Sequence, residues 1–341
     1  MNWTPCRTLI LLVLLPWAAV SVAHGLLPER VVSRGDYRRP AGIPFPDGNS
    51  YSEAKAELGQ LLLFDPILSG SRSRSCATCH NPGLSWGDGL ARAIGEGQAA
   101  MAFRAPTLLN VAWAPRLGWD GKFRDLESVA FGPITSAANM NLPESVLIER
   151  LTAIPGYVRS FGAAFGEGPI TRRNIEAALA TYERSIVSAT APFDRWVMGD
   201  EEAIDQNAKR GFDIFTGKGR CSECHSGWAF TDSSFHDIGT AQGDDIGRGR
   251  LFPTSIKLRY AFKTPTLRDV ARRAPYMHNG SLATLQDVIA LYDRGGIARP
   301  SRSALIGPLG LTDNEKADLV AFLRTLTSPP QSVPVPILPR S

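Results

Sequence analysis

Histidine, methionine and cysteine are scarce in this sequence of 341 residues, which contains five of each. Five cysteines are too few for a scaffold held together by many disulfides. No histidine occurs between His80 and His225, so that stretch cannot supply a second histidine ligand to a metal bound beside His80. Blocks of lysine and arginine are also lacking and the formal charge is only +4, which gives no support for binding to nucleic acid.

The sequence has one long apolar run, and it lies near the N-terminus. Arg7 precedes the run, which extends from Leu9 to Val22, is interrupted by Pro16 and ends in small residues. This order is typical of a secretory signal peptide, so we expect residues 1–23 to be removed. An uncleaved membrane anchor is the alternative, although the run is short for a span. No later segment is apolar enough to cross a membrane, so we predict no stable membrane insertion after cleavage.

Strand-like alternation is scarce as well, whereas helical spacing of apolar residues is common. We predict a mostly α-helical fold, with helices near residues 52–65, 143–153, 172–188, 205–216, 284–293 and 312–326. The last helix opens with Thr312 and Glu315, the spacing of a capping box. Residues 24–50 are rich in proline, glycine and arginine and are predicted to form an extended arm. The proline-rich residues 329–341 are predicted to form a tail that either wraps around the protein or hangs free.

The chain contains an internal repeat with an offset of 159 residues. Residues 103–112 match residues 262–271, and Trp119-Asp-Gly falls on His278-Asn-Gly. The match extends to two further pairs of apolar residues, Leu126 with Leu285 and Val129 with Val288. The repeat predicts two related modules that arose by duplication and then diverged in function, with a boundary near residue 190.

Each predicted domain, residues 51–190 and residues 191–328, carries one Cys-x-x-Cys-His sequence. These motifs are Cys76-Ala-Thr-Cys79-His80 and Cys221-Ser-Glu-Cys224-His225. The spacing is that of c-type haem attachment, because two thiols three positions apart reach both vinyl groups of one porphyrin and the next histidine lies under the iron. A zinc site would need both pairs pooled and no histidine after each, and a redox disulfide is the other alternative. We therefore predict two covalently bound haem c groups.

The face of the first iron opposite His80 is predicted to be open. The stretch up to His225 offers no histidine for this face. An open, five-coordinate iron is what peroxide binding requires. Met101 and Met140 are the side chains that could close the face instead.

With these features together, the sequence resembles the bacterial di-haem cytochrome c peroxidases, and among them the MauG/MbnH-type enzymes. The resemblance rests on both haem motifs, the repeated Pro-Thr-Leu segments, Trp119-Asp-Gly and the segment from Pro275 to Gly280. It covers essentially the whole chain after the signal peptide. It implies two mostly helical, cytochrome-c-like haem domains that face each other across the inter-haem interface. The first haem would be the peroxide site and the second the electron-transfer haem.

The resemblance also implies a periplasmic oxidoreductase. Hydrogen peroxide at the open first haem would form a high-valent di-haem state, which oxidises an amino acid, by resemblance tryptophan, on a secreted partner protein by long-range electron transfer. The alternative is a conventional di-haem cytochrome c peroxidase that reduces H2O2 with electrons from a small redox protein. A third hypothesis is an electron carrier with both irons six-coordinate, against which the shortage of ligands argues.

The axial ligand of the second haem separates these types of enzyme. Tyr292 lies where the resemblance to conventional peroxidases would require a methionine, and a tyrosine there is similar to the MauG/MbnH type. A phenolate is a hard anionic ligand that favours ferric and higher oxidation states. Met277 and His236 are the alternative ligands.

Trp119 corresponds by resemblance to the residue that relays charge between the haems. Trp86 and Trp113 are competing aromatic residues nearby in the sequence. His236 and His278 are predicted to lie behind the haems, close to propionates or water, or else to be structural.

The distal pocket of the first haem departs from the family pattern. Glu96 stands where conventional peroxidases place a distal histidine, and Pro133 matches a pocket proline of the family. The family's distal glutamate and glutamine fall on Asn139 and Val129, neither of which can move a proton. Glu96, Glu127 or a chain of waters would then have to move the proton.

The resemblance further implies a calcium ion between the haems, and two departures argue against it. The position of its asparagine ligand is occupied by Arg104, and one carbonyl donor falls on Arg273, although Pro275 is retained.

Overall fold

The computed structural model describes Met1 and residues 32–340. Apart from Met1, the predicted signal peptide at residues 1–23 lies outside the described residues, as does the start of the predicted arm. Within the part of the chain that is described, no helix combines the length and the apolar character needed to cross a bilayer.

All six predicted helices are present. They are α1 Glu53–Phe64, α4 Glu144–Thr152, α6 Arg172–Ser185, α8 Gln206–Thr216, α9 Leu285–Arg294 and α10 Asp313–Thr325. Five begin after a side chain that accepts a hydrogen bond from the backbone N–H three residues later: Ser52, Thr171, Asp205, Thr284 and Thr312. These caps satisfy N–H groups that have no partner within the helix. Thr312 and Glu315 form the predicted capping box.

Helices that contain or begin with proline are not predicted by apolar spacing. Proline occupies the first position of α5 Pro155–Phe165 and of α7 Pro192–Val197, where its missing N–H costs nothing. α3 Leu126–Thr135 contains Pro133 in its interior, and α2 Cys76–Cys79 is a single turn. α3 and α9 are equivalent residue for residue under the offset of the repeat. Both copies of the repeat therefore retain this helix, although Pro133 hides the helical pattern of α3 in the sequence.

Strands are minimal, as the sequence predicts. β1 Phe235–His236 pairs antiparallel with β2 Phe262–Lys263, so that Phe235 faces Lys263 and His236 faces Phe262. The remaining connections are loops and short 3-10 turns. The mostly α-helical fold class is confirmed.

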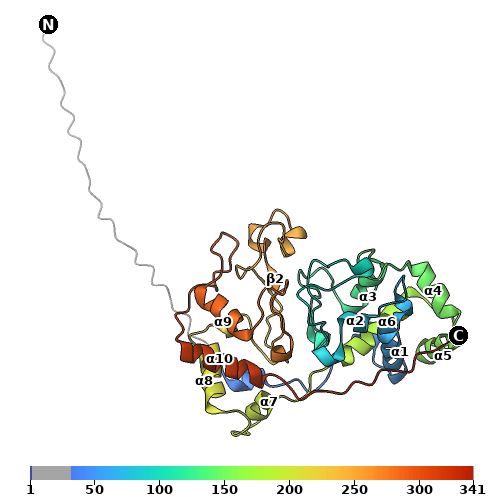
Figure 1. Cartoon of the computed structure of the whole chain (residues 1–341), viewed down its shortest axis with the longest axis horizontal. Coiled ribbons are helices and arrows are strands. Elements are labelled where there is room, and N and C mark those ends of the chain that lie inside the picture. The colour runs from blue at the N-terminus through green and yellow to red at the C-terminus, as the bar shows by residue number, and fades with distance from the viewer. Residues whose placement is uncertain (2–31, 341) are drawn as a thin grey trace. The chain divides into compact units, whose positions relative to one another are not determined.

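Each half of the chain is built on a pair of crossing helices, α1 with α6 and α8 with α10 (Figure 1). A glycine lies at each crossing. A Cβ on Gly59 would stand 2.1 Å from the carbonyl oxygen of Ala178, and one on Gly211 would stand 2.0 Å from the carbonyl oxygen of Asp318. Only glycine permits this approach of two backbones.

The two halves fill their cores differently. The first half packs mainly aliphatic side chains around α1 and α6, including Leu58, Leu62, Leu147, Leu151, Ile175 and Leu179. The second half packs aromatic rings around α8 and α10. Phe193, Phe212, Phe230 and Phe322 have neighbouring ring centroids 5.3–6.0 Å apart.

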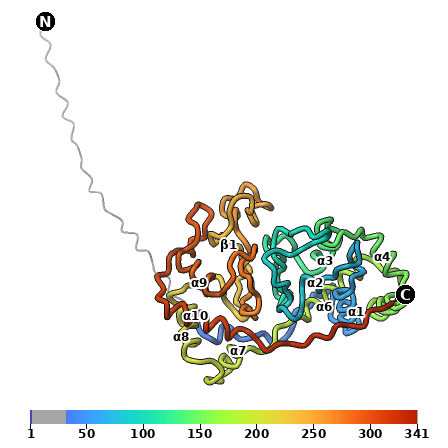
Figure 2. The backbone as a smooth tube through the Cα atoms, viewed as in Figure 1, coloured from blue at the N-terminus to red at the C-terminus, as the bar shows by residue number. Residues whose placement is uncertain are grey.

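The segment before α1 packs on the second half of the chain, and the segment after α10 packs on the first. Tyr37, from the predicted arm, is fully buried against Phe193, Phe212 and Phe230 of the second half. The tail after α10 runs back to the first half (Figure 2), where Gln60 of α1 donates to the carbonyl of Pro334. Of the two conformations considered for the tail, it adopts the wrapped one.

Substituting alanine for Gly59 or Gly211 should destabilise the protein by about 1–3 kcal/mol each, because the added methyl forces a close helix pair apart. Thermal denaturation of the haem-loaded protein would measure the change. Gly162, inside α5, is the matched control, since a Cβ there meets nothing within 4 Å. Gly162→Ala should be neutral or stabilising by up to about 1 kcal/mol. Equal effects at all three positions would contradict the role of the crossings.

Candidate functional site

The two Cys-x-x-Cys-His turns have the same local geometry. In each, the backbone N–H of the histidine donates to the carbonyl of the first cysteine at 2.8 Å. The Nδ1 of His80 then donates to the carbonyl of Trp86 at 3.2 Å, and the Nδ1 of His225 to the carbonyl of Phe230 at 2.8 Å. Burial lowers the pKa of both imidazoles, so both are neutral near pH 7. A neutral ring with its proton on Nδ1 leaves the Nε2 lone pair available to a metal.

The four cysteines of these turns form no disulfides with one another. Burial raises the pKa of Cys76 and of Cys221 to about 12. Such thiols are not poised to act as thiolate nucleophiles, and the structure gives no support for a redox disulfide. The two pairs also belong to different halves of the chain, so they are not pooled as a zinc site would require.

A large cavity, lined mainly by the second half and in part by first-half residues such as Arg104 and Trp119, gathers the residues predicted to hold the second haem. Its walls include Cys221, Cys224, His225 and, from α9, Tyr292. Burial, followed by the nearby charges of Cys221 and Cys224, raises the pKa of the Tyr292 phenol. One cavity thus offers two thiols, an imidazole and a phenol, a donor set that fits a c-type haem with histidine and tyrosine as axial ligands.

Cations without carboxylate partners also line this cavity, including Lys263 and Arg273. Burial, and then the charge of Arg273, lowers the pKa of Lys263 to about 8. Burial lowers the pKa of Arg273 to about 10, and its Nε is buried without a hydrogen-bond partner. Buried charges of this kind need counter-charges. The two carboxylates of a haem would supply them, so the cavity fits the group in its charge as well as in its ligands.

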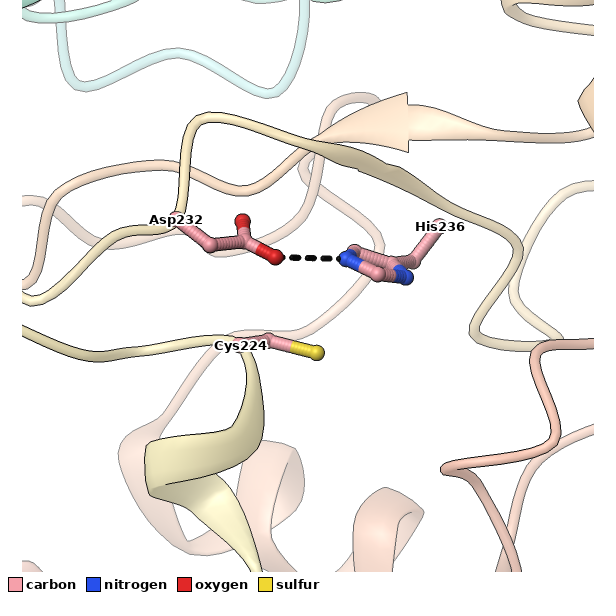
Figure 3. A group of neighbouring side chains, drawn as sticks. All are labelled: Cys224, Asp232 and His236. Atoms are coloured by element: carbon pink, nitrogen blue, oxygen red, sulfur yellow. Dashed lines mark hydrogen bonds and ion pairs between the residues drawn. The ribbon is translucent and has the colours of Figure 1, made fainter.

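His236 is held away from a ligand role by its own hydrogen bond. Its Nε2 donates to Asp232 at 2.8 Å beside the Sγ of Cys224 (Figure 3). The bond to Asp232 raises the pKa of His236 to about 10, and a protonated imidazole has no lone pair for iron. Although Cys224, Asp232 and His236 lie close enough to share a metal ion, Cys224 belongs to the attachment motif. Met277, the other alternative ligand, also lines the cavity.

The first site differs from the second at one repeat-equivalent position. Pro133 of α3 corresponds to Tyr292 of α9, and the two helices have equivalent bounds. A proline ring has no atom that can bind iron. Val129 lies one turn earlier on α3, where it packs against Leu117 and Leu126. The duplicated helix therefore carries a potential ligand in one half and none at the same place in the other.

The remaining predicted distal residues lie on two loops that contact each other. The backbone N–H of Glu96 donates to the carbonyl of Asn139 at 2.8 Å, and that of Met140 donates to the carbonyl of Pro133 at 3.2 Å. Glu96, Asn139 and Pro133 are thus brought together around the end of α3. The side chain of Met140 is 3 % exposed within the aliphatic core of the first half.

Both acids considered as proton shuttles are already engaged. The Glu96 carboxylate lies 3.5 Å from the Nε of Arg74 and accepts from the hydroxyl of Ser71 at 3.2 Å. Glu127 accepts two hydrogen bonds from Arg184, at 2.7 and 2.8 Å. Despite its burial, the hydrogen bonds from Arg184 hold the pKa of Glu127 below its usual range. Glu127 therefore remains ionised, whereas Glu96 is less tightly held.

The two copies of the repeat meet each other around Trp119. The backbone N–H of Arg104 donates to the carbonyl of His278 at 3.0 Å, and that of Lys263 to the carbonyl of Trp119 at 2.8 Å. These bonds are equivalent, because Arg104 corresponds to Lys263 and Trp119 to His278. Rings pair in the same way, with centroids 6.4 Å apart for Trp119 and His278. The repeats therefore pack about a pseudo-two-fold relation.

The side chains at this boundary break the symmetry. The Nε1 of Trp119 donates to the carbonyl of Arg104 at 3.1 Å. His278 is instead stacked on Phe262, with centroids 3.6 Å apart, and bonds to Asp245 through its Nε2 at 2.6 Å. His278 is 3 % exposed and lines the cavity of the second half, as does Trp119. Of the three candidate tryptophans, Trp119 lines the cavity. Trp113 also reaches the second half, where it packs against Trp228, whereas Trp86 packs against Tyr182 within the first half.

The residues at the predicted calcium position do not fit a calcium ion. The Nη1 of Arg104 donates to the carbonyl of Arg273 at 2.9 Å, which occupies the oxygen that would face the ion. Burial lowers the pKa of Arg273, and the charge of Arg104 lowers it further against the effect of Asp269, so a second positive group stands near this place. Calcium requires six to eight oxygen ligands, and a positive side chain at this place excludes it.

Several of these contacts were not predicted from the sequence. The main examples are the two cations that line the cavity, Lys263 and Arg273, and the hydrogen bond between His278 and Asp245. The repeat was a usable signal for the contacts between its copies, because duplicated modules that pack face to face bring equivalent residues together.

Comparison with known proteins agrees with this arrangement. Residues 53–202 match the family model described as di-haem cytochrome c peroxidase, and residues 208–327 match the model described as cytochrome c. The chain is therefore a haem c protein of two cytochrome-c-like halves. It belongs to the di-haem cytochrome c peroxidase family, which includes MauG, and is a haem oxidoreductase of the peroxidase type.

Similar proteins carry two kinds of name. The chain is 48 % identical to the methylamine utilization protein MauG of Methylorubrum extorquens, over 94 % of this chain and 92 % of that protein. It is 42 % identical to MauG of Methylophilus methylotrophus, over 98 % and 99 %. The cytochrome c551 peroxidase of Nitrosomonas europaea is 33 % identical over 84 % of each. Among solved structures, a MauG-like protein associated with microbial copper homeostasis has a TM-score of 0.79 and 31 % identity, over 85 % of this chain and 94 % of that one.

Proposed function

We propose that this protein is a periplasmic di-haem enzyme that uses hydrogen peroxide to oxidise a residue, most naturally tryptophan, on a secreted partner protein. The observation that carries the proposal is the asymmetry at one repeat-equivalent position, with Tyr292 in the second half and Pro133 in the first. The location follows from the predicted signal peptide at residues 1–23 and from c-type haem attachment.

In this proposal, each Cys-x-x-Cys-His turn holds one haem c. Cys76 and Cys79 bind the first haem and Cys221 and Cys224 the second through thioether bonds. The Nε2 atoms of His80 and His225 would bind the irons. When bound, the two haems supply the redox chemistry, in which one peroxide is reduced to water and two oxidising equivalents are retained.

In this proposal, residues of the two halves have different roles at the two haems. Pro133 and Val129 offer no ligand atom, so the iron of the first haem would stay available to a small oxidant such as peroxide. Tyr292 lies in the cavity with His225, where its oxygen would bind the second iron after losing its proton to the surroundings. As a hard anionic ligand it would favour higher oxidation states over the ferrous state. Lys263 and Arg273, which line the cavity, would hold the carboxylates of the second haem by charge.

Trp119 connects the two sites in this proposal. Its ring lines the cavity of the second half although it belongs to the first, and its Nε1 is fixed by the carbonyl of Arg104. An indole held this way can lose and regain an electron without moving. The substrate residue can then be oxidised from the protein surface, so the partner has to dock but not to enter a pocket.

A conventional peroxidase is the second candidate, because relatives named cytochrome c551 peroxidase match most of the chain. Such an enzyme would take electrons from a small redox protein. Tyr292 in place of a methionine ligand, and the engagement of His236 by Asp232, weigh against it.

The test uses the purified haem-loaded protein without added reductant. Electron paramagnetic resonance of the ferric protein should give one high-spin and one low-spin signal. One equivalent of hydrogen peroxide should then produce a spectral change that lasts for minutes. Two low-spin signals, or a reaction that starts only after half-reduction and turns over rapidly with reduced cytochrome c, would favour the conventional peroxidase.

A further inference from the structure

One buried residue connects the two repeats and Trp119. The backbone N–H of Arg104 donates to the carbonyl of His278, and its carbonyl accepts from the Nε1 of Trp119. Its guanidinium donates to the carbonyl of Arg273. The N–H, the carbonyl and the guanidinium of Arg104 therefore all form hydrogen bonds at the boundary. Those of the N–H and the guanidinium join the two repeats.

The guanidinium of Arg104 carries its charge in a place without a direct ion pair. Arg104 is 8 % exposed and makes no salt bridge within the part of the chain that is described. Asp88 is the acidic group whose charge acts on it, and the Oδ2 of Asp88 is buried without a hydrogen-bond partner. The positive charge therefore donates to a backbone carbonyl and is attracted by a half-buried acid, as a bound cation would be.

We propose that the guanidinium of Arg104 takes the place of a metal ion at the boundary between the repeats and thereby positions Trp119. The charge is supplied by the chain itself, so the boundary is assembled without calcium. Arg104 is a positioning residue, since it acts through the hydrogen bond from its carbonyl to the indole. Only the effect on electron relay rests on the proposed function; the absence of a metal requirement does not.

The equivalent residue of the second repeat shows why the side chain matters. Lys263 makes the same backbone hydrogen bond, to Trp119, and like Arg104 it lines the haem cavity. A guanidinium presents several donors in a rigid plane, so Arg104 can hold one carbonyl while the rest of its charge faces elsewhere. Both side chains line the cavity, and the guanidinium of Arg104 in addition holds the carbonyl of Arg273 across the boundary.

The first experiment uses the unaltered haem-loaded protein. We expect no stoichiometric calcium by elemental analysis after dialysis, and no change in absorption spectrum or thermal midpoint on treatment with EGTA. Bound calcium at one ion per chain, or a spectrum that changes with EGTA and returns with calcium, would overturn the proposal.

The second experiment replaces the cation by an oxygen donor. Arg104→Asn places an amide oxygen opposite the carbonyl of Arg273, and we expect the thermal midpoint to fall and to rise by at least about 2 °C when calcium is added. Peroxide-driven oxidation of a donor should fall in EGTA and recover with calcium. A midpoint and activity equal to wild type in EGTA would overturn the positioning role.

Arg150→Met is the matched control, because Arg150 also donates to backbone carbonyls, those of Ile67 and Ser69, within the first half. It should lower the thermal midpoint without any response to calcium. If Arg104→Asn fails to load haem, the elemental analysis and EGTA titration of the wild type still decide the proposal. If those succeed while the spectroscopic asymmetry of the haems fails, the proposed function is wrong and the metal-free boundary stands.

Discussion

Replacing Tyr292 by methionine is expected to raise the reduction potential of the second haem by an amount on the order of 0.1 V, within the span of about 0.8 V that axial ligands produce. The phenolate stabilises ferric iron through its charge, whereas a thioether is neutral and soft and favours the ferrous state. Spectroelectrochemical titration of the haem-loaded protein measures the shift. The variant should also lose the lasting response to peroxide.

Two further variants make this prediction specific. Tyr292→Phe keeps the ring and removes the oxygen, so the low-spin signal of the second haem should become high-spin. Tyr276→Phe is the control, because Tyr276 lines the same cavity but its hydroxyl donates to the carbonyl of Val270. Its potential should stay at the wild-type value. If Tyr292→Met leaves both potentials and spectra unchanged, Tyr292 is not the ligand and Met277 becomes the residue to examine.

Replacing Trp119 by phenylalanine is expected to slow peroxide-driven oxidation of an external donor by roughly 10–100-fold, the usual cost of removing a group that supports a metal centre. Phenylalanine keeps the packing against His278 but loses the Nε1–H bond to Arg104, and its ring is much harder to oxidise. Haem content and the ferric spectrum should be unchanged. Stopped-flow absorption after mixing with one equivalent of peroxide and donor measures the rate.

Trp113→Phe is the matched control for this variant, since Trp113 packs edge to face against Trp228 with centroids 4.7 Å apart. It should lower stability without slowing the reaction. A rate loss of the same size in both variants would show that aromatic packing, and not relay through Trp119, limits the reaction.

The fold was largely predictable because apolar spacing and caps act locally. Thr312 with Glu315, for example, defines the start of α10 within one turn of sequence. The helices around Pro133, Pro155 and Pro192 were not predicted. Proline is favoured in the first turn of a helix but usually breaks a helix interior, and the local sequence does not show which case applies. Contacts made by the ends of the chain, such as that of Gln60 with Pro334, depend on residues far apart in sequence.

The candidate site was predictable only where covalent chemistry fixes the spacing. The two haem motifs and the equivalence of Pro133 and Tyr292 are visible in the sequence. The engagement of His236 by Asp232 and of Glu127 by Arg184 is not, because it depends on side chains that meet only in the folded chain. These partners decide whether a histidine can bind iron or a carboxylate can move a proton, so ligand and proton assignments need the structure.

Paired hydrogen bonds join the two repeats at their boundary, from Arg104 to His278 and from Lys263 to Trp119. Because both repeats belong to one chain, this boundary can be asymmetric. In an assembly of two identical chains related by a true two-fold axis, every residue occurs twice. An indole on one side of the boundary would then require an indole at the equivalent place on the other side. Joining the modules into one polypeptide releases that constraint. Each mutation then alters a single side of the boundary, so a proline can stand in one half at the position where the other half has Tyr292.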